Sequence, residues 1–222
     1  MLRLIRENLS MDAFRTAAFS KRTATALILA IPVLVGIFIA GELGRNVGNY
    51  TRDIPALFEI SPLTGLLSTL GLLVWAGSAA VWYCCRILAE KRGDRRMRRF
   101  ATASLFLTLW LVLDDSFMIH EGLIPNHLPF PEKGVLALVA CAGLAYVVLF
   151  RNLLASALFP LAFAFVPLAL SLIIDDVGAV WITDRIGDWE FLLEDGLKWL
   201  GIVGWLGHAL LWFRRLLDEQ PR

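Results

Sequence analysis

Short catalytic signatures are absent from this sequence. It holds no GxSxG elbow, no Walker loop, no HExxH segment and no CxxCH segment, so serine hydrolase, nucleotide-driven and c-type haem functions gain no support. Cysteine is scarce as well, and three residues of this type give no disulfide framework. No polar segment exceeds about 22 residues, which leaves no room for a separate soluble domain.

Long apolar runs make up most of the sequence. Hydrophobic residues make up 58% of the chain, and the mean hydropathy is +0.66. Helices of about 20 residues at 1.5 Å per residue cross the ~30 Å hydrocarbon layer, where every backbone group needs an internal partner. We therefore expect an all-α integral membrane protein, a bundle of six transmembrane helices over about 23–41, 63–87, 100–120, 134–150, 153–175 and 191–213. The expected domains are a cytoplasmic amphipathic leader over 1–22, the transmembrane domain over 23–217 and a cytoplasmic tail over 218–222.

The charges are distributed unevenly between the two ends of these helices. With the N-terminus in the cytoplasm and the helices alternating, the inner segments hold 16 of the 21 basic residues and the outer segments hold 14 of the 20 acidic residues. Basic residues stay on the cytoplasmic side because they resist translocation. We therefore expect both termini to be cytoplasmic. The basic run over 86–99 fits a topology determinant beside membrane lipids, and nothing in it indicates nucleic acid.

Two consecutive carboxylates, Asp114 and Asp115, end the third apolar run. A charge inside hydrocarbon costs at least ~2.5–3.5 kcal/mol, so such a pair suggests a functional site. If the third helix extends to His120, Asp114 lies ~9 Å below its outer end at 1.5 Å per residue, and Lys198 lies at about the same depth on the last helix. An unpaired charge at that depth would be costly, so we predict a contact between Lys198 and Asp114 or Asp115. On the last helix, Gly201 should let a neighbouring helix approach closely.

Further polar residues fall in the outer third of the expected bundle. This region holds seven carboxylates and one histidine but only one lysine, Lys198. The carboxylates and the histidine are Asp114, Asp115, His120, Glu121, Asp175, Asp176, Glu194 and Asp195. This surplus of acids fits a bound divalent cation, with oxygen ligands suiting Ca²⁺, Mg²⁺ or Mn²⁺ and with Zn²⁺ an option through the histidine. The candidate metal ligands are Asp115, His120, Glu121, Asp176, Glu194 and Asp195. The alternative is that the acids at helix ends are solvated in the headgroup layer.

Two segments carry a resemblance to known families. DDSFMIHEG at 114–122 and EDGLKWLG at 194–201 resemble paired signatures of a family of uncharacterised bacterial multipass membrane proteins, which implies a bacterial inner membrane but no activity. Ser116-x-x-x-His120 beside an Asp is similar to one motif of the CREST membrane hydrolases, which are zinc amidases and include alkaline ceramidases. Those enzymes carry two histidines four residues apart on their last helix, whereas here His208 is followed by Trp212 at that spacing. They also have seven helices, against the six expected in this chain.

Three functions stay open on these residues. A metal-dependent hydrolase acting on a lipid-like substrate would use Asp114, Asp115, Ser116 and His120 as catalytic residues. A proton- or cation-coupled transporter or channel subunit, expected as a homodimer, would use Asp114, Lys198 and His208 as an ion-paired gate. A non-catalytic accessory protein would use the polar cluster to fix helix register. His208 lies in the inner half, where we expect a packed histidine that is hydrogen-bonded across helices.

Overall fold

The computed structural model describes residues 21–129, 131–175, 184–187 and 189–218, and within these ranges helices are the only regular secondary structure. The expected leader therefore lies almost wholly outside the described residues, as does the tail beyond residue 218. The chain divides into two compact units, Met1–Thr64 and Gly65–Arg222. The predicted all-α class is confirmed for the described residues.

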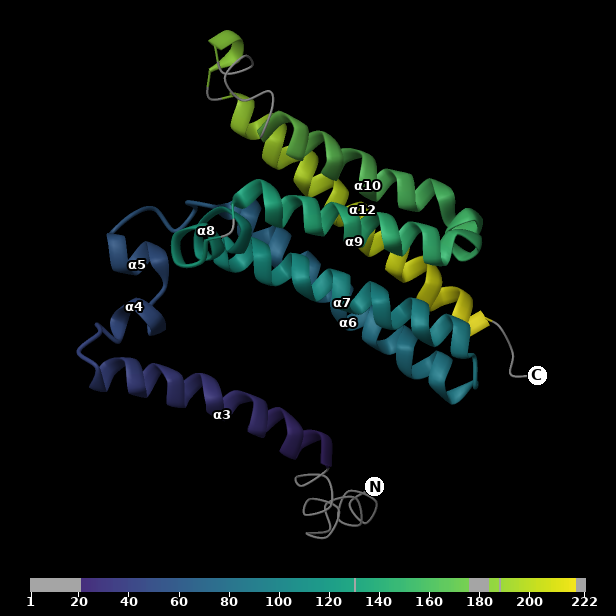
Figure 1. The fold of residues 1–222 in the computed structure, drawn as a ribbon, viewed down its shortest axis with the longest axis horizontal. Helices are drawn as coiled ribbons and strands as arrows, with labels where there is room; N and C mark the ends of the chain where they lie inside the picture. Colours follow the sequence, from purple (N-terminus) through teal and green to yellow (C-terminus); the bar gives the residue numbers. More distant parts are fainter. Residues whose placement is uncertain (1–20, 130, 176–183, 188, 219–222) are drawn as a thin grey trace, which may run out of the picture. The chain divides into compact units, whose positions relative to one another are not determined.

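The described part of the first unit is one long helix followed by two short ones. Helix α3 (Lys21–Glu42) contains Pro32, and α4 (Gly48–Thr51) and α5 (Ile54–Phe58) follow it (Figure 1). Large apolar side chains of α3 such as Leu34 and Phe38 are about two-thirds exposed within the molecule. A helix with this much unburied apolar surface is typical of contact with lipid or with another helix.

The second unit carries the residues of the expected polar site. Its helices are α6 (Leu66–Lys91), α7 (Arg95–Phe117), the π-helix η1 (Ile119–Leu123), α8 (Ile124–His127), α9 (Glu132–Leu154), the 3₁₀ turn η2 (Ala155–Ala157), α10 (Leu158–Ile173) and α12 (Trp189–Asp218). Helices α6 and α7 form a hairpin, and α12 packs against both α6 and α10 (Figure 1). Asp94 starts α7 by accepting a hydrogen bond from the Met97 backbone N–H at 2.9 Å.

Three stretches of the described residues are long and apolar enough to cross a membrane: Leu66–Lys91, Arg95–Phe117 and Lys133–Ile173. Each of the six predicted ranges contains a helix, but only these stretches meet both conditions, so six crossings stay a prediction. The third stretch is 41 residues long, which at 1.5 Å per residue is ~60 Å and about twice the hydrocarbon thickness. It is folded back on itself at η2, so that α9 and α10 run in opposite directions (Figure 1).

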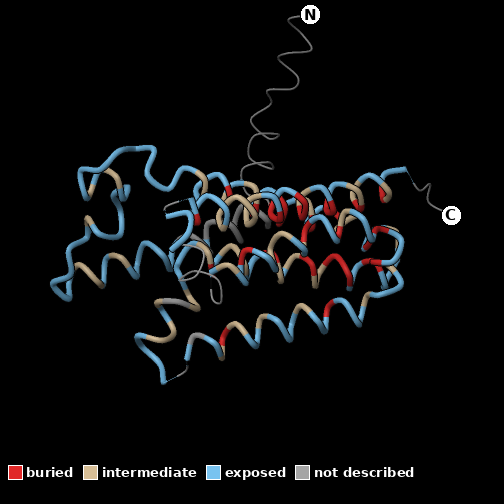
Figure 2. The backbone as a smooth tube through the Cα atoms, turned by 90° about the horizontal axis from the view of Figure 1, so that it is seen from above, coloured by how far each residue is buried: buried red, intermediate tan, exposed pale blue. Residues whose placement is uncertain are grey.

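The core of the second unit lies in the half that contains the α6–α7 turn. Figure 2 shows buried residues gathered toward that end of the helices, while the other end is mostly exposed or intermediate. The largest fully buried side chains are Trp82, Phe100, Trp205, Ile202 and His208. Because α7 begins at this end, its basic N-terminal turn marks the packed half as the one predicted to be cytoplasmic.

Small residues let α10 and α12 approach closely. A Cβ added at Gly201 would lie 2.8 Å from the Ala164 carbonyl oxygen, and one at Gly204 would lie 2.7 Å from the Phe163 carbonyl oxygen. The close approach predicted at Gly201 is thus confirmed, and Gly204 belongs to the same contact. Small residues at helix crossings are the usual means of tight packing between membrane helices.

Two buried hydroxyl groups on α7 connect it to its neighbours. Ser104 Oγ donates to the Phe100 carbonyl oxygen at 2.9 Å and lies 2.9 Å from the Tyr146 hydroxyl of α9. Trp205 Nε1 of α12 donates to Thr108 Oγ1 at 2.8 Å. These polar atoms are satisfied inside the bundle, so the two contacts fix the rotation of α7 without an unpaired buried group.

Candidate functional site

Helix α7 ends earlier than the sequence suggests. A single helix over 100–120 was expected, but α7 stops at Phe117 and Met118 is in the left-handed conformation, with φ 47° and ψ 50°. The π-helix η1 follows directly. A left-handed residue other than glycine costs about 1–3 kcal/mol, and both such residues and π-turns are frequent at functional sites. The prediction of one helix over 100–120 is therefore wrong at its end, where α7 stops at Phe117, the chain reverses at Met118 and the π-helix η1 follows.

This reversal brings Asp114 and His120 together. The Asp114 carboxylate accepts the His120 backbone N–H through Oδ1 at 3.0 Å, and its Oδ2 lies 2.7 Å from His120 Nδ1. Both side chains are only about one-eighth exposed, at 12% for Asp114 and 13% for His120. An uninterrupted α-helix would place residues six apart on different faces, so the contact depends on the break at Met118. The carboxylate thus caps the start of η1 and holds the imidazole ring in one orientation.

The neighbouring carboxylate has a different partner. Asp115 Oδ1 forms an ion pair with Lys198 Nζ of α12, which is the contact predicted from the depths of the two residues. Asp115 Oδ2 is buried and has no hydrogen-bond partner among the described residues. A small cavity of about 10 Å³ lies beside this pair, and Ser68 and Asp195 also line it. That volume is near the minimum for one water molecule.

Among the other predicted site residues, Asp195 lies at the cavity beside this pair, and Ser116 does not line it. Ser116 Oγ donates to the Val112 carbonyl oxygen at 2.6 Å and lies on the exposed side of α7. Asp176 lies outside the described residues, and so does the side chain of Glu121. Within the described part of the chain, no three His, Cys, Asp or Glu side chains are grouped as a metal site would require.

His208 lies in the packed half, away from the carboxylates. Its ring centroid is 5.7 Å from Trp82, 5.6 Å from Trp205 and 6.4 Å from Phe100 and Trp212. Neither ring nitrogen has a hydrogen-bond partner among the described residues, and the residue is fully buried. The predicted hydrogen bond across helices is therefore wrong, because the neighbours of the imidazole on α6, α7 and α12 are aromatic rings.

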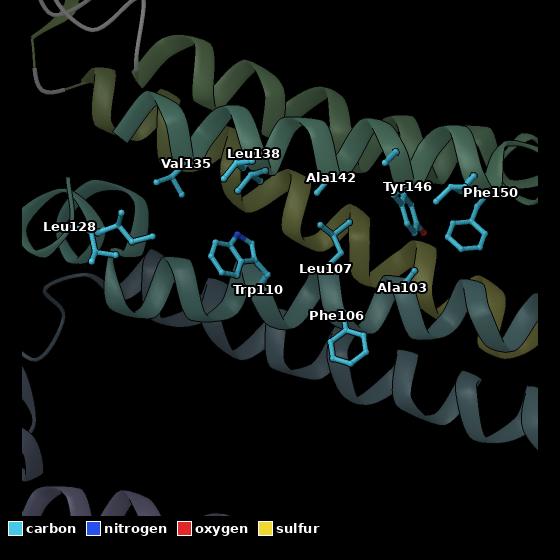
Figure 3. A pocket seen from close by; sticks show the side chains of 14 residues that line it. Ala103, Phe106, Leu107, Trp110, Leu128, Val135, Leu138, Ala142, Tyr146 and Phe150 are labelled. Atoms are coloured by element: carbon cyan, nitrogen blue, oxygen red, sulfur yellow. The ribbon is translucent and has the colours of Figure 1, made fainter. Parts of the chain in front are cut away.

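An apolar groove runs between α7 and α9 (Figure 3). Its volume is about 780 Å³, and its walls include Phe106 and Trp110 of α7 and Ala142 of α9. At one end it is bordered by Ile124 and Leu128, which follow η1 directly. The sequence does not predict this groove, because a helix that is apolar on every side does not reveal which face lacks a packed neighbour.

The fold and site define the class of the protein. It is a helical protein with helices long and apolar enough for a membrane location, and it carries paired polar side chains near the end of one such helix. Residues 24–212 match a family described as Domain of unknown function (DUF8692), and since the match covers most of the chain, the protein belongs to this family. No match was found among curated proteins or among solved structures.

Proposed function

We propose that this protein crosses a bacterial inner membrane six times and hydrolyses a lipid-like substrate at the outer ends of α7 and α12. The site consists of Asp114, His120, Asp115 and Lys198, with a divalent cation as its cofactor. The observation that carries the proposal is the contact of Asp114 with His120 Nδ1 at 2.7 Å. A carboxylate that holds one nitrogen of an imidazole is the usual companion of a metal-binding or proton-transferring histidine.

Each of the two pairs would offer one group to a cation, although no three His, Cys, Asp or Glu side chains are grouped within the described residues. With Nδ1 held by Asp114, a metal bond or a proton transfer of the His120 ring would use Nε2. Asp115 Oδ2 offers a buried carboxylate oxygen that forms no hydrogen bond with any described residue. A divalent cation held here would activate a bound water as the nucleophile. In this proposal, the remaining ligands and the residues that position the substrate would come from Ser116, Glu121, Asp176, Glu194 and Asp195.

Access to the site favours a substrate from the membrane. The end of the unit that holds Asp115 and Lys198 has few buried residues, whereas the opposite end is closely packed. A lipid-like molecule could therefore reach the pair from the surrounding hydrocarbon without crossing the packed half. The fold-back of α9 and α10 at η2 supports two crossings by the Lys133–Ile173 stretch, as the six-helix topology requires.

The transport alternative has less support from the contacts. A gate formed by Asp114, Lys198 and His208 would need these groups along one path, but Lys198 pairs with Asp115 and Asp114 pairs with His120. His208 is surrounded by aromatic rings and is fully buried, which fits a packed position better than a water-lined path. The accessory alternative uses the same two pairs only to fix helix register.

Elemental analysis of the purified full-length protein tests the proposal. We expect about one divalent ion per chain in the wild type and its loss in Asp115→Asn, since that variant removes a charged ligand. Asp218→Asn, an exposed carboxylate at the far end of α12, is the matched control and should keep the ion. Absence of a stoichiometric ion from the wild type would overturn the hydrolase proposal, and proton flux in reconstituted vesicles would then test the gate. An ion that persists in Asp115→Asn would exclude this site as its location.

A further inference from the structure

The groove between α7 and α9 has walls that are almost entirely apolar. Its one hydroxyl-bearing residue, Tyr146, already lies 2.9 Å from Ser104 Oγ and so is engaged within the bundle. Figure 3 shows Trp110 and Leu107 of α7 opposite Val135 and Leu138 of α9. The other polar side-chain atom of the lining is the Trp110 indole nitrogen, a single donor, so a polar headgroup, sugar or nucleotide would lose most of its hydration without compensation.

The two walls also fix the medium that surrounds the groove. Both α7 and α9 belong to stretches that are long and apolar enough to cross a membrane, so the open side of the groove faces hydrocarbon in that setting. Its lining extends along α9 from Val135 to Phe150, which at 1.5 Å per residue is ~22 Å and more than half of the ~30 Å hydrocarbon layer. The volume of about 780 Å³ lies within the range of small-molecule sites.

We propose that this groove holds one acyl chain of a membrane lipid, with the polar end of that lipid at the η1–α8 segment. At the end of the groove, Ile124 is the first residue after η1 and Leu128 is the C-cap of α8, and η1 carries His120. The inference rests on the proposed function for its link to the polar site, because it identifies the substrate class as a lipid that presents its headgroup there. The binding of the chain itself rests on the groove alone.

Lipid retention by the full-length protein tests this proposal. The probe is dioleoyl phosphatidylcholine, added to detergent-purified protein and counted as bound copies by native mass spectrometry. Ala142→Trp fills the groove from α9, and Ala140→Trp places the same side chain on an exposed position of α9 that does not line it. Ala103→Phe fills the groove from α7 and serves if Ala142→Trp does not fold.

We expect one lipid bound to the wild type and to Ala140→Trp. Affinity should fall about tenfold or more in Ala142→Trp, which corresponds to ~1.4 kcal/mol of binding free energy. Equal retention by all variants would show that the lipid is bound elsewhere and would overturn the proposal. A change of oligomeric state in Ala142→Trp with unchanged lipid would assign the groove to a second copy of the chain. Absence of retained lipid from the wild type would also overturn the proposal. That result is expected if another helix of this chain fills the groove.

The metal content of the same samples separates the two proposals. A groove variant that loses lipid but keeps its ion would support the groove as an independent binding site. If the wild type contains no metal but lipid retention still falls in the groove variants, the hydrolase proposal is overturned and the acyl-chain site is supported.

Discussion

Asp114 and Asp115 are neighbours in the sequence, yet their partners come from different elements. Successive residues of a helix point about 100° apart, so one carboxylate is directed toward η1 and the other toward α12. Each acid thus has its own positively charged or ionisable partner, His120 or Lys198. Removal of one member of such a pair is unfavourable to the extent that the other charge is buried, and the two carboxylates are the more buried partners. The pair of acids therefore joins three elements at one point.

The His208 ring gives a prediction at the scale of one residue. Its two nitrogens lack hydrogen-bond partners among the described residues, and a buried polar group in this state costs about 1–3 kcal/mol. His208→Leu removes that cost while it keeps most of the volume, so we expect the free energy of unfolding to stay the same or rise by up to ~3 kcal/mol. His208→Ala leaves a cavity among the aromatic rings and should lower it by about 2–5 kcal/mol. Chemical denaturation in detergent measures both.

The comparison of these two variants can also contradict the interpretation. If His208→Leu destabilised the protein as much as His208→Ala, the imidazole nitrogens would be making a favourable interaction, such as one with a buried water. The imidazole would then be a polar element of the core and not a packing residue.

Residue contacts were predictable from sequence only where both helices are straight. The Asp115–Lys198 pair follows from equal depth on two regular helices, because 1.5 Å per residue converts sequence position into depth. The Asp114–His120 contact could not be predicted in this way. It needs a left-handed residue at Met118, and no glycine or proline marks the position.

At the scale of helices, the crossing of α10 and α12 depends on two glycines. The position of Gly204 gives a sharp test because its added Cβ would meet backbone atoms, the Phe163 carbonyl oxygen at 2.7 Å and Ala164 Cα at 2.9 Å. Backbone cannot move aside as a flexible side chain can, so Gly204→Ala should lower the free energy of unfolding by about 1–3 kcal/mol. Gly207→Ala on the same helix is the matched control, since nothing lies within 4 Å of its added Cβ.

Thermal and chemical unfolding of the two variants measure the difference. The control should be neutral or stabilising by up to ~1 kcal/mol, because alanine is the better helix former. Equal stability of Gly204→Ala and Gly207→Ala would mean that α10 and α12 do not meet at this glycine.

The sequence predicted where the helices lie better than where they end. Each of the six apolar ranges coincides with a helix, because a bilayer-length run of apolar residues has one stable backbone conformation in hydrocarbon. The end of α7 and the groove beside α9 are not predictable from the sequence, for two different reasons. No glycine or proline marks the left-handed Met118, and apolar helices carry little periodicity from which to infer which faces meet at the groove.

The whole second unit has one closely packed half and one looser half. Aromatic rings of α6, α7 and α12 fill the half that holds the α6–α7 turn, and the Phe100 ring centroid lies 5.4 Å from that of Trp82 and 5.2 Å from that of Trp212. Arg215 closes this half by donating to the Ser156 hydroxyl at 2.9 Å and to its carbonyl oxygen at 2.8 Å. A closely packed half combined with a looser half suits a protein that exchanges molecules with one leaflet.

The predicted topology places these two halves on opposite sides of the membrane. Single cysteines in a background without the three native ones, labelled with a membrane-impermeant maleimide, report the side of each loop. The positions expected on the cytoplasmic side are Lys91→Cys, Asn152→Cys and Asp218→Cys. The positions expected on the outer side are Asn49→Cys, Asn126→Cys and Asp184→Cys. Those on the outer side should react in intact cells, and the others only after permeabilisation.

Asn126 and Asn152 decide the number of crossings. Asn126 precedes α9 and Asn152 lies in its last turn, so labelling from opposite sides requires that α9 cross the bilayer, and the fold-back at η2 then makes α10 a separate crossing. The seven basic residues over 86–99 should hold the α6–α7 turn in the cytoplasm, because translocation of that many cations is unfavourable. Labelling of Asn126 and Asn152 from one side would reduce the number of crossings. It would also remove the membrane argument for the acyl-chain groove, since α9 would no longer stand in hydrocarbon along its length. Opposite labelling would place the Asp115–Lys198 pair near the outer surface, where the proposed substrate enters.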